Sequence, residues 1–278
     1  MKKITNLLLI YIVLFACSIS EAMDSKESSG QQARKLYLIA EAHSSTGGVK
    51  TCHQMMREKR EEEKLNLFIE RDAARLEWAR KEATLLTCDS EEEFFLNHEE
   101  HRKKLNPKVA SCIYSMIDST KSESEREGRI RNRFWFLQIL KEFGNSPTIN
   151  IIPCDASIKE VIHYIKTKQN IKGLGLLRIH IELIEETPDD CQNSVNEVMK
   201  DSHSLKPRNL KITASLNQKT EVDTINIALL GLVHAGWVYD YLSRDIQITP
   251  FKTSFPPDDL ERERSQPGVE EFLKNATK

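Results

Sequence analysis

Four short apolar runs in this 278-residue chain constrain its fold more than any other feature. Short apolar runs bounded by turn residues are typical of strands that are buried on both faces of a sheet. Strands of this kind belong to parallel sheets, in which helices cover both faces. We therefore predict an α/β fold with a mostly parallel central sheet flanked by helices. The runs are residues 36–40, 65–69, 149–153 and 225–230, and a final strand is expected at 246–251.

The chain is expected to consist of a removable leader, one large domain and a tail. A basic start, an apolar stretch at 7–16 and a small-residue cleavage pattern are typical of a bacterial secretory signal peptide. Between the second and third runs, helical patterns continue for too long to be a simple crossover, and we interpret this segment as a helical insertion or cap. The expected parts are a signal peptide at 1–22, a flexible leader at 23–35, an α/β core at 36–252 with the insertion at 72–145, and an exposed tail at 253–278.

The leader predicts export to the periplasm or secretion. Lipoprotein processing at Cys17 is a less favoured alternative, because Phe15 fits that pattern poorly. No later apolar run approaches the length of a membrane span, so no transmembrane helix is expected in the mature protein. The chain has 40 basic and 42 acidic residues and a net charge of −2, which gives no electrostatic case for nucleic acid as a partner.

Five cysteines would remain after cleavage, and their number is odd. Export permits disulfides, but at least one thiol must then be free or paired with another chain. Cys52, Cys88 and Cys112 lie in the same half of the sequence and are the favoured candidates for pairing. The absence of any CxxC pair gives no support for a zinc site built from cysteines.

Acidic and imidazole side chains follow the predicted strands closely. In an open parallel sheet, ligands bind at the carboxyl ends of the strands, so these side chains are expected to converge on one crevice. Carboxylate and imidazole groups are ligands for zinc, manganese or iron, and both can act as general bases. The residues are Glu41 and His43 after the first run, Glu70 and Arg71 after the second, Asp155 after the third and His234 after the fourth.

Each of these motifs has a simpler structural interpretation when it is taken alone. Glu41 and His43 can be solvated groups that end a strand, and Glu70 can belong to an ion pair at a helix start. Asp155 can cap the next helix, and His234 can be a buried histidine with a satisfied hydrogen bond. The combination of acids and histidines at four strand ends favours function, because random polar residues would include Ser, Asn, Lys and Thr.

Two other chemistries receive little support. Gly173-Leu174-Gly175 lacks the later glycine of a dinucleotide fingerprint and does not follow a strand, so nucleotide binding is rejected. The chain has no GxSxG elbow, which argues against serine hydrolase chemistry on the usual α/β-hydrolase plan. Cys154 remains an alternative nucleophile with His43 or His234 as its base, although a buried structural cysteine is the favoured interpretation.

The order of these motifs resembles a diverse superfamily that includes the TraB/TIKI proteins, the ChaN-like haem-binding lipoproteins and the erythromycin esterases. The resemblance implies an α/β core with long helical inserts and a site built from two histidines and glutamate. In some members such a site is a metal-dependent peptidase or an esterase, and in others it binds haem. Three motifs carry it: Ala40-Glu41-Ala42-His43, with Ala in place of the family's Gly, then Glu70-Arg71, and then Gly231-Leu232-Val233-His234.

The first functional hypothesis is an exported hydrolase that depends on a divalent metal. The substrate would be a peptide, an ester or another small molecule. His43, Glu70 and His234 would bind manganese, zinc, iron or cobalt, and the metal would lower the pKa of a bound water. Glu41 would be a further ligand or the general base. A metal-free version keeps the same residues, with His43 or Glu41 as the base.

Two further residues have roles in this hypothesis. Arg71 would bind an anionic group of the substrate, because its planar guanidinium matches carboxylate and phosphate. Asp155 would orient one of the metal ligands without contacting the metal itself, as carboxylates do around metal-binding histidines.

Two hypotheses from other classes remain open. One is a module that binds haem or another flat ligand under the helical cap, although an aromatic content of 7% argues against it. The other is an exported interaction or virulence protein with a degenerate site, whose charged segment at 49–145 is the contact surface. The sequence leaves the oligomeric state open.

Overall fold

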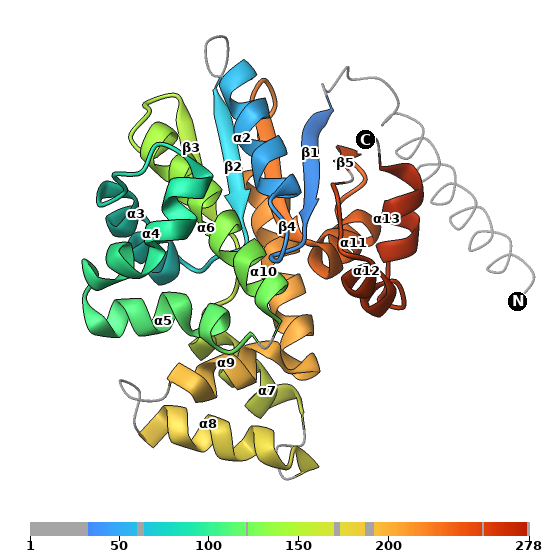
Figure 1. Ribbon diagram of the computed structural model, residues 1–278. Coiled ribbons are helices and arrows are strands. Elements are labelled where there is room, and N and C mark those ends of the chain that lie inside the picture. Colours follow the sequence, from blue (N-terminus) through green and yellow to red (C-terminus); the bar gives the residue numbers. More distant parts are fainter. Residues whose placement is uncertain are drawn as a thin grey trace, which may run out of the picture. The chain divides into compact units, whose positions relative to one another are not determined.

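The computed structural model describes residues 33–59, 64–120, 122–169, 173–186, 192–251 and 253–276. Figure 1 shows their arrangement. The predicted signal peptide, Cys17 and most of the predicted leader lie outside the described residues. No helix in the described part of the chain is long and apolar enough to cross a membrane.

Five parallel strands form one sheet in the order β3-β2-β4-β1-β5. Strands β1 and β2 lie on either side of β4, so the adjacency on which the predicted site depends is confirmed. The first strand begins two residues earlier than expected, and Arg34 pairs with Asp245 at 2.6 Å instead of belonging to a leader. The bounds are β1 Arg34–Glu41, β2 Leu65–Ile69, β3 Ile149–Pro153, β4 Ile225–Gly231 and β5 Ile246–Phe251.

Helices cover both faces of the sheet, because successive strand residues point to opposite sides. In β4, Ile227 and Leu229 join the core on the side of α2 and α6, whereas Ala228 and Leu230 join the core beneath α10, α11 and α13. The predicted α/β fold, with a parallel sheet flanked by helices, is therefore confirmed. These helices are α2 Gly47–Lys59, α6 Glu123–Phe143, α10 Ser202–Lys219, α11 Leu232–Tyr241 and α13 Val269–Asn275.

The chain between β2 and β3 forms the predicted helical insertion. Its helices begin where Asp, Ser or Asn side chains accept hydrogen bonds from the first turn, as N-caps do. They pack against one another and against one face of the sheet. They are α3 Ala73–Thr84, α4 Glu91–Lys103, α5 Pro107–Asp118 and α6.

A buried polar cluster joins the four helices of the insertion. Glu82 of α3 is fully buried, accepts a hydrogen bond from Tyr114 of α5 at 3.2 Å and pairs with Arg133 of α6. His101 of α4 lies 3.5 Å from the same carboxylate. Burial opposes ionisation of Glu82, but Arg133 and His101 outweigh it and lower the pKa of Glu82 to about 2.

In a segment whose polar composition suggests turns, residues 211–216 resemble a short edge strand, but the structure contradicts this interpretation. These residues lie inside α10, where Ile212 and Leu216 are buried one turn apart. Their four-residue spacing fits a helix, but the polar residues between them hide that pattern. The other helices of this half are α7 Ile158–Lys168, α8 Leu176–Glu186 and α9 Gln192–Lys200.

The expectation of an exposed tail after residue 252 is also wrong. The segment forms α12 Pro257–Glu263 and α13, and Val269 and Phe272 are fully buried in the core beneath α11. A Cβ atom on Gly236 of α11 would lie 2.6 Å from the Val269 nitrogen, so glycine permits this close approach. A few apolar residues at helical spacing thus pack the segment against the core, although its composition is rich in charged residues.

Two of the favoured disulfide partners, Cys52 and Cys88, are not in a disulfide, and the side chain of Cys112 lies outside the described part of the structure. Cys52 and Cys88 are buried free thiols, as is Cys154. Burial places these side chains in the core, where they pack as small apolar groups. Cys191 lies outside the described residues.

Candidate functional site

A pocket lies at the carboxyl ends of the strands, and all six predicted site residues line it. Its volume of about 310 Å³ is at the lower end of the range typical for small-molecule sites. Helices of the insertion, α9, α10 and α12 supply the remaining walls. The predicted convergence is therefore confirmed for Glu41, His43, Glu70, Arg71, Asp155 and His234.

Glu41 and His43 form a carboxylate–imidazole pair at the end of β1. Glu41 is buried beside Gly231 of β4, and its Oε1 lies 3.1 Å from His43 Nδ1. The His43 side chain is 38% exposed, so the ring reaches into the pocket. Burial lowers the pKa of His43, but the hydrogen bond to Glu41 and the charges of Glu41 and Glu70 outweigh it, and the net shift is upward.

Helix α6 packs against the loop that carries His43 and holds it in place. Asn132 donates a hydrogen bond to the Ser45 carbonyl oxygen at 2.8 Å. A Cβ atom on Gly128 would overlap the Ser44 carbonyl group, so only glycine lets the helix approach this closely. The insertion thus holds the imidazole in place as well as covering the pocket.

Glu70 lies at the centre of a saturated network. One of its oxygens accepts the Gly231 backbone N–H at 2.6 Å, at the N-terminus of α11, where the helix dipole favours negative charge. The other accepts from Arg208 at 2.6 Å and lies 3.3 Å from His234 Nε2. Burial opposes ionisation, but His234, Arg208 and His43 outweigh it and hold the pKa of Glu70 well below its ordinary value.

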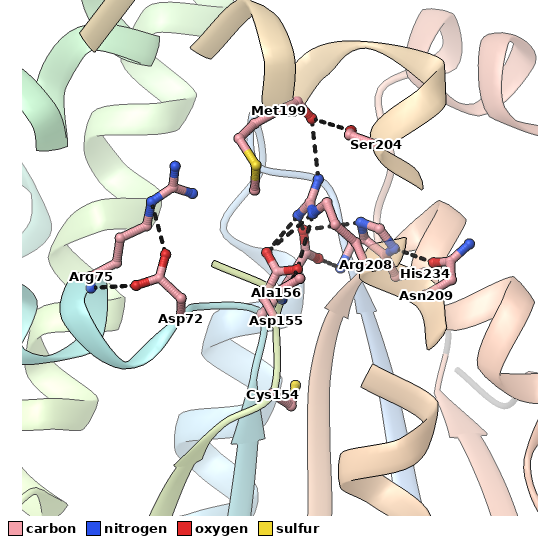
Figure 2. Close-up of polar contacts among 12 residues, drawn as sticks. Asp72, Arg75, Cys154, Asp155, Ala156, Met199, Ser204, Arg208, Asn209 and His234 are labelled. Atoms are coloured by element: carbon pink, nitrogen blue, oxygen red, sulfur yellow. Dashed lines mark hydrogen bonds and ion pairs between the residues drawn. The ribbon is translucent and has the colours of Figure 1, made fainter. Parts of the chain in front are cut away.

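Arg208 of α10 is a central residue that sequence reasoning missed. Its guanidinium binds Asp155 at 2.8 Å (Figure 2) and also Glu70, so it bridges two buried carboxylates. Asp155 therefore holds Arg208 and does not orient a histidine, while the N-cap of α7 is Ser157. No local signal marks Arg208, because the segment around it was interpreted as turns.

His234 is fixed through both ring nitrogens. Nε2 faces Glu70, and Nδ1 contacts the side-chain oxygen of Asn209, a second residue of α10 that sequence reasoning missed (Figure 2). The side chain is buried, with 6% of its surface exposed. The interpretation of His234 as a buried histidine with satisfied hydrogen bonds fits this arrangement well.

Arg71 differs from the other basic residues of the pocket. Its backbone is anchored between Ile69 and Asp155, and its guanidinium carbon lies 5.3 Å from the ring centre of Phe136. It forms no ion pair with any residue in the described part of the chain. Burial and the charges of Arg133 and Arg75 outweigh the opposing charges of Glu41 and Glu70 and lower the pKa of Arg71 to about 10, so it remains cationic at neutral pH.

The donor atoms do not fit a metal ion in this arrangement. Among the described residues, no three His, Cys, Asp or Glu side chains are grouped so that they could hold one. A cation on Glu70 would have to displace the Arg208 guanidinium, which already binds that carboxylate. The divalent metal of the first hypothesis therefore stays a prediction.

Cys154 is not a nucleophile in this geometry. Its thiol is fully buried and donates to the Ile69 carbonyl oxygen at 3.0 Å. Burial and the nearby carboxylates of Asp155 and Glu70 raise its pKa well above the ordinary value, which disfavours the reactive thiolate.

The class that the fold and the pocket define is an α/β protein with an all-parallel sheet and a polar pocket at the carboxyl edge of its strands. Comparisons of the chain with protein-family models, with curated proteins and with solved structures gave no match. The resemblance to the TraB/TIKI, ChaN-like and erythromycin esterase proteins thus stays a prediction.

Proposed function

We propose that this protein is a hydrolase that cleaves an ester or peptide bond, with His43 as the general base and Glu41 as the carboxylate that orients it. The observation that supports this proposal is the Glu41–His43 pair. In it, a buried carboxylate lies beside Nδ1 of a partly exposed imidazole at the pocket. When the Nδ1–H group donates a hydrogen bond to the Glu41 carboxylate, the lone pair of Nε2 is free to accept a proton from water.

The remaining residues of the pocket support this role by position and charge. Arg208 forms ion pairs with both Glu70 and Asp155, so the floor of the pocket is held by a network of buried ion pairs. Nε2 of His43 lies near the carboxyl end of β4, since a Cβ atom on Gly231, the last residue of that strand, would lie 3.7 Å from it. A water activated there would meet a substrate bound between the strand ends and the insertion.

Substitution of His43 tests the proposal directly. His43→Ala should reduce kcat/KM for chromogenic esters and peptides by about 10²- to 10⁴-fold, the usual contribution of a positioned general base. Glu41→Gln should lower kcat by less, because the imidazole remains but loses its orienting charge. His203→Ala is the matched control, because His203 also pairs with a carboxylate, Asp201, but lies outside the pocket.

The same assay separates the alternatives. Full activity of His43→Ala, with an unchanged unfolding temperature, would contradict the assignment. Activity that a chelator abolishes and manganese or zinc restores would favour the metal-dependent version. Absence of hydrolysis, together with a Soret band on haem addition that His43→Ala removes, would favour the haem-binding alternative.

A further inference from the structure

The side of the pocket formed by the insertion is rich in arginine, but most of these charges are already neutralised. Arg75 pairs with Asp72 at 3.4 Å, and Arg129 pairs with Glu125 at 2.7 Å. Arg71 is the exception among these pocket arginines. Glu41 and Glu70 lie close enough for their charges to act on Arg71, but no described carboxylate forms an ion pair with it, so its guanidinium is open to bind an anion from a ligand.

The Phe136 ring holds Arg71 in place beside a second arginine. The guanidinium carbons of Arg71 and Arg133 lie 5.3 Å and 5.9 Å from the centre of the same ring. Arg133 is paired with the buried Glu82, so its charge is already compensated by a carboxylate. Stacking on the ring limits the orientations of the Arg71 fork, which reduces the entropy lost when it binds a planar anion.

Apolar side chains of the insertion line the same pocket. They come from α3 and α5, and they include Trp78, Ile113 and Met116. A ligand held here would therefore place an acidic group on the arginine and an apolar body against these helices. The pocket volume of about 310 Å³ suits a small molecule.

We propose that the substrate is a small amphipathic acid whose carboxylate or phosphate is bound by the Arg71 guanidinium, with its apolar body against α3 and α5. The assignment of this acid as a substrate rests on the proposed hydrolase function. The anion-binding subsite itself does not, because it is defined by Arg71, Phe136 and the apolar wall.

Calorimetric titration with probes that contain no carboxylic ester or peptide bond tests the subsite separately from the proposed reaction. The probes are phenylacetate, phenyl phosphate, inorganic phosphate and the neutral benzyl alcohol. Wild type should bind one aromatic anion at least tenfold more tightly than benzyl alcohol and more tightly than inorganic phosphate. The tighter of phenylacetate and phenyl phosphate identifies the acidic group.

Variants of the arginine give the decisive comparison. Arg71→Gln should lose the preference for anions, by about tenfold or more, because a charged hydrogen-bonding partner is removed. Arg71→Lys should bind with intermediate affinity, because it keeps the charge but loses the planar fork. Arg178→Gln is the control, since Arg178 is an exposed arginine of α8 that pairs with Glu182.

The results of these titrations distinguish failure of the anion-binding subsite from failure of the hydrolase proposal. Equal binding of anions and benzyl alcohol by wild type overturns the subsite, as does an unchanged preference in Arg71→Gln. If Arg71→Gln does not fold, the comparison uses Arg71→Lys. An affinity of Arg71→Lys for the aromatic anions equal to that of wild type overturns the role given to the planar guanidinium. If His43→Ala binds the probes normally and neither it nor wild type hydrolyses any ester, the subsite stands and the hydrolase proposal fails.

Discussion

At the scale of single residues, the pocket depends on one arginine that pairs with two buried carboxylates. Glu70 and Asp155 come from different strands, and 7% and 2% of their side-chain surfaces are exposed. Two buried carboxylates that contact the same guanidinium would repel each other strongly if no cation lay between them. Arg208 supplies that cation from α10, 138 residues along the chain from Glu70.

Removal of this arginine should therefore destabilise the fold. Arg208→Ala should lower the free energy of unfolding by about 3–5 kcal/mol, the usual result of breaking a buried ion pair from one side. Urea unfolding followed by circular dichroism measures the change. Lys211→Ala is the control on the same helix, because its pair with Glu160 is exposed and should contribute about 0–1 kcal/mol. Equal effects of the two variants would contradict the role given to Arg208.

At the scale of elements, the insertion is held together by polar contacts as well as by its apolar core. Glu82 contacts residues of α4, α5 and α6 from its position in α3. Such a cluster fixes the relative positions of four helices, because the buried carboxylate requires its partners in one geometry. The same helices line the pocket and hold the loop of His43.

The lowered pKa of Glu82 predicts how stability changes with pH. A carboxyl group whose pKa is about 2 when folded and about 4.3 when unfolded stabilises the fold above the unfolded value. That stabilisation is lost as the pH falls from about 4.3 toward 2. We expect wild type to lose a few kcal/mol of stability over this range, at about 1.4 kcal/mol per pH unit.

Substitution of Glu82 checks this assignment. Glu82→Gln should be less stable than wild type at pH 7, because Arg133 loses its partner, and its stability should fall less steeply in acid. Urea unfolding at several pH values between 3 and 7 measures both effects. Glu77→Gln, an exposed position of α3, should keep the wild-type profile. An unchanged acid slope in Glu82→Gln would show that other carboxyl groups cause the loss.

At the scale of the whole molecule, the final helix is part of the core. Residues from Arg34 to Lys278 form one compact unit, and α13 packs against α11, the helix that carries His234. The segment just before it, α12, lines the pocket through Asp259, which also accepts a hydrogen bond from Ser44 at 2.7 Å. The C-terminal segment thus contributes to the stability of the fold and to the wall of the pocket.

Truncation of one buried side chain in α13 tests this statement. Phe272→Ala should lower the free energy of unfolding by about 3–5 kcal/mol, as expected for loss of a buried phenyl ring. Lys274→Ala, an exposed position of the same helix, should change it by less than about 0.5 kcal/mol. Thermal unfolding of both variants makes the comparison. Similar unfolding temperatures would mean that α13 does not belong to the cooperative unit.

The sequence by itself determined the features that depend on neighbouring residues. Apolar runs marked all five strands, and capping residues with helical spacing marked the helices of the insertion. The six predicted site residues also line one pocket, because parallel strands present their carboxyl ends at one edge of the sheet. These patterns are readable because each arises within a few residues of the chain.

Only the tertiary structure decided which distant side chains meet. Arg208 and Asn209 lie in a segment without a clear local pattern, yet they hold Glu70 and His234. The position of Arg71 against the Phe136 ring, without an ion pair to any described residue, is likewise visible only in the tertiary structure. Packing and charge compensation depend on contacts between residues far apart in the chain, and no local pattern in the sequence records those contacts.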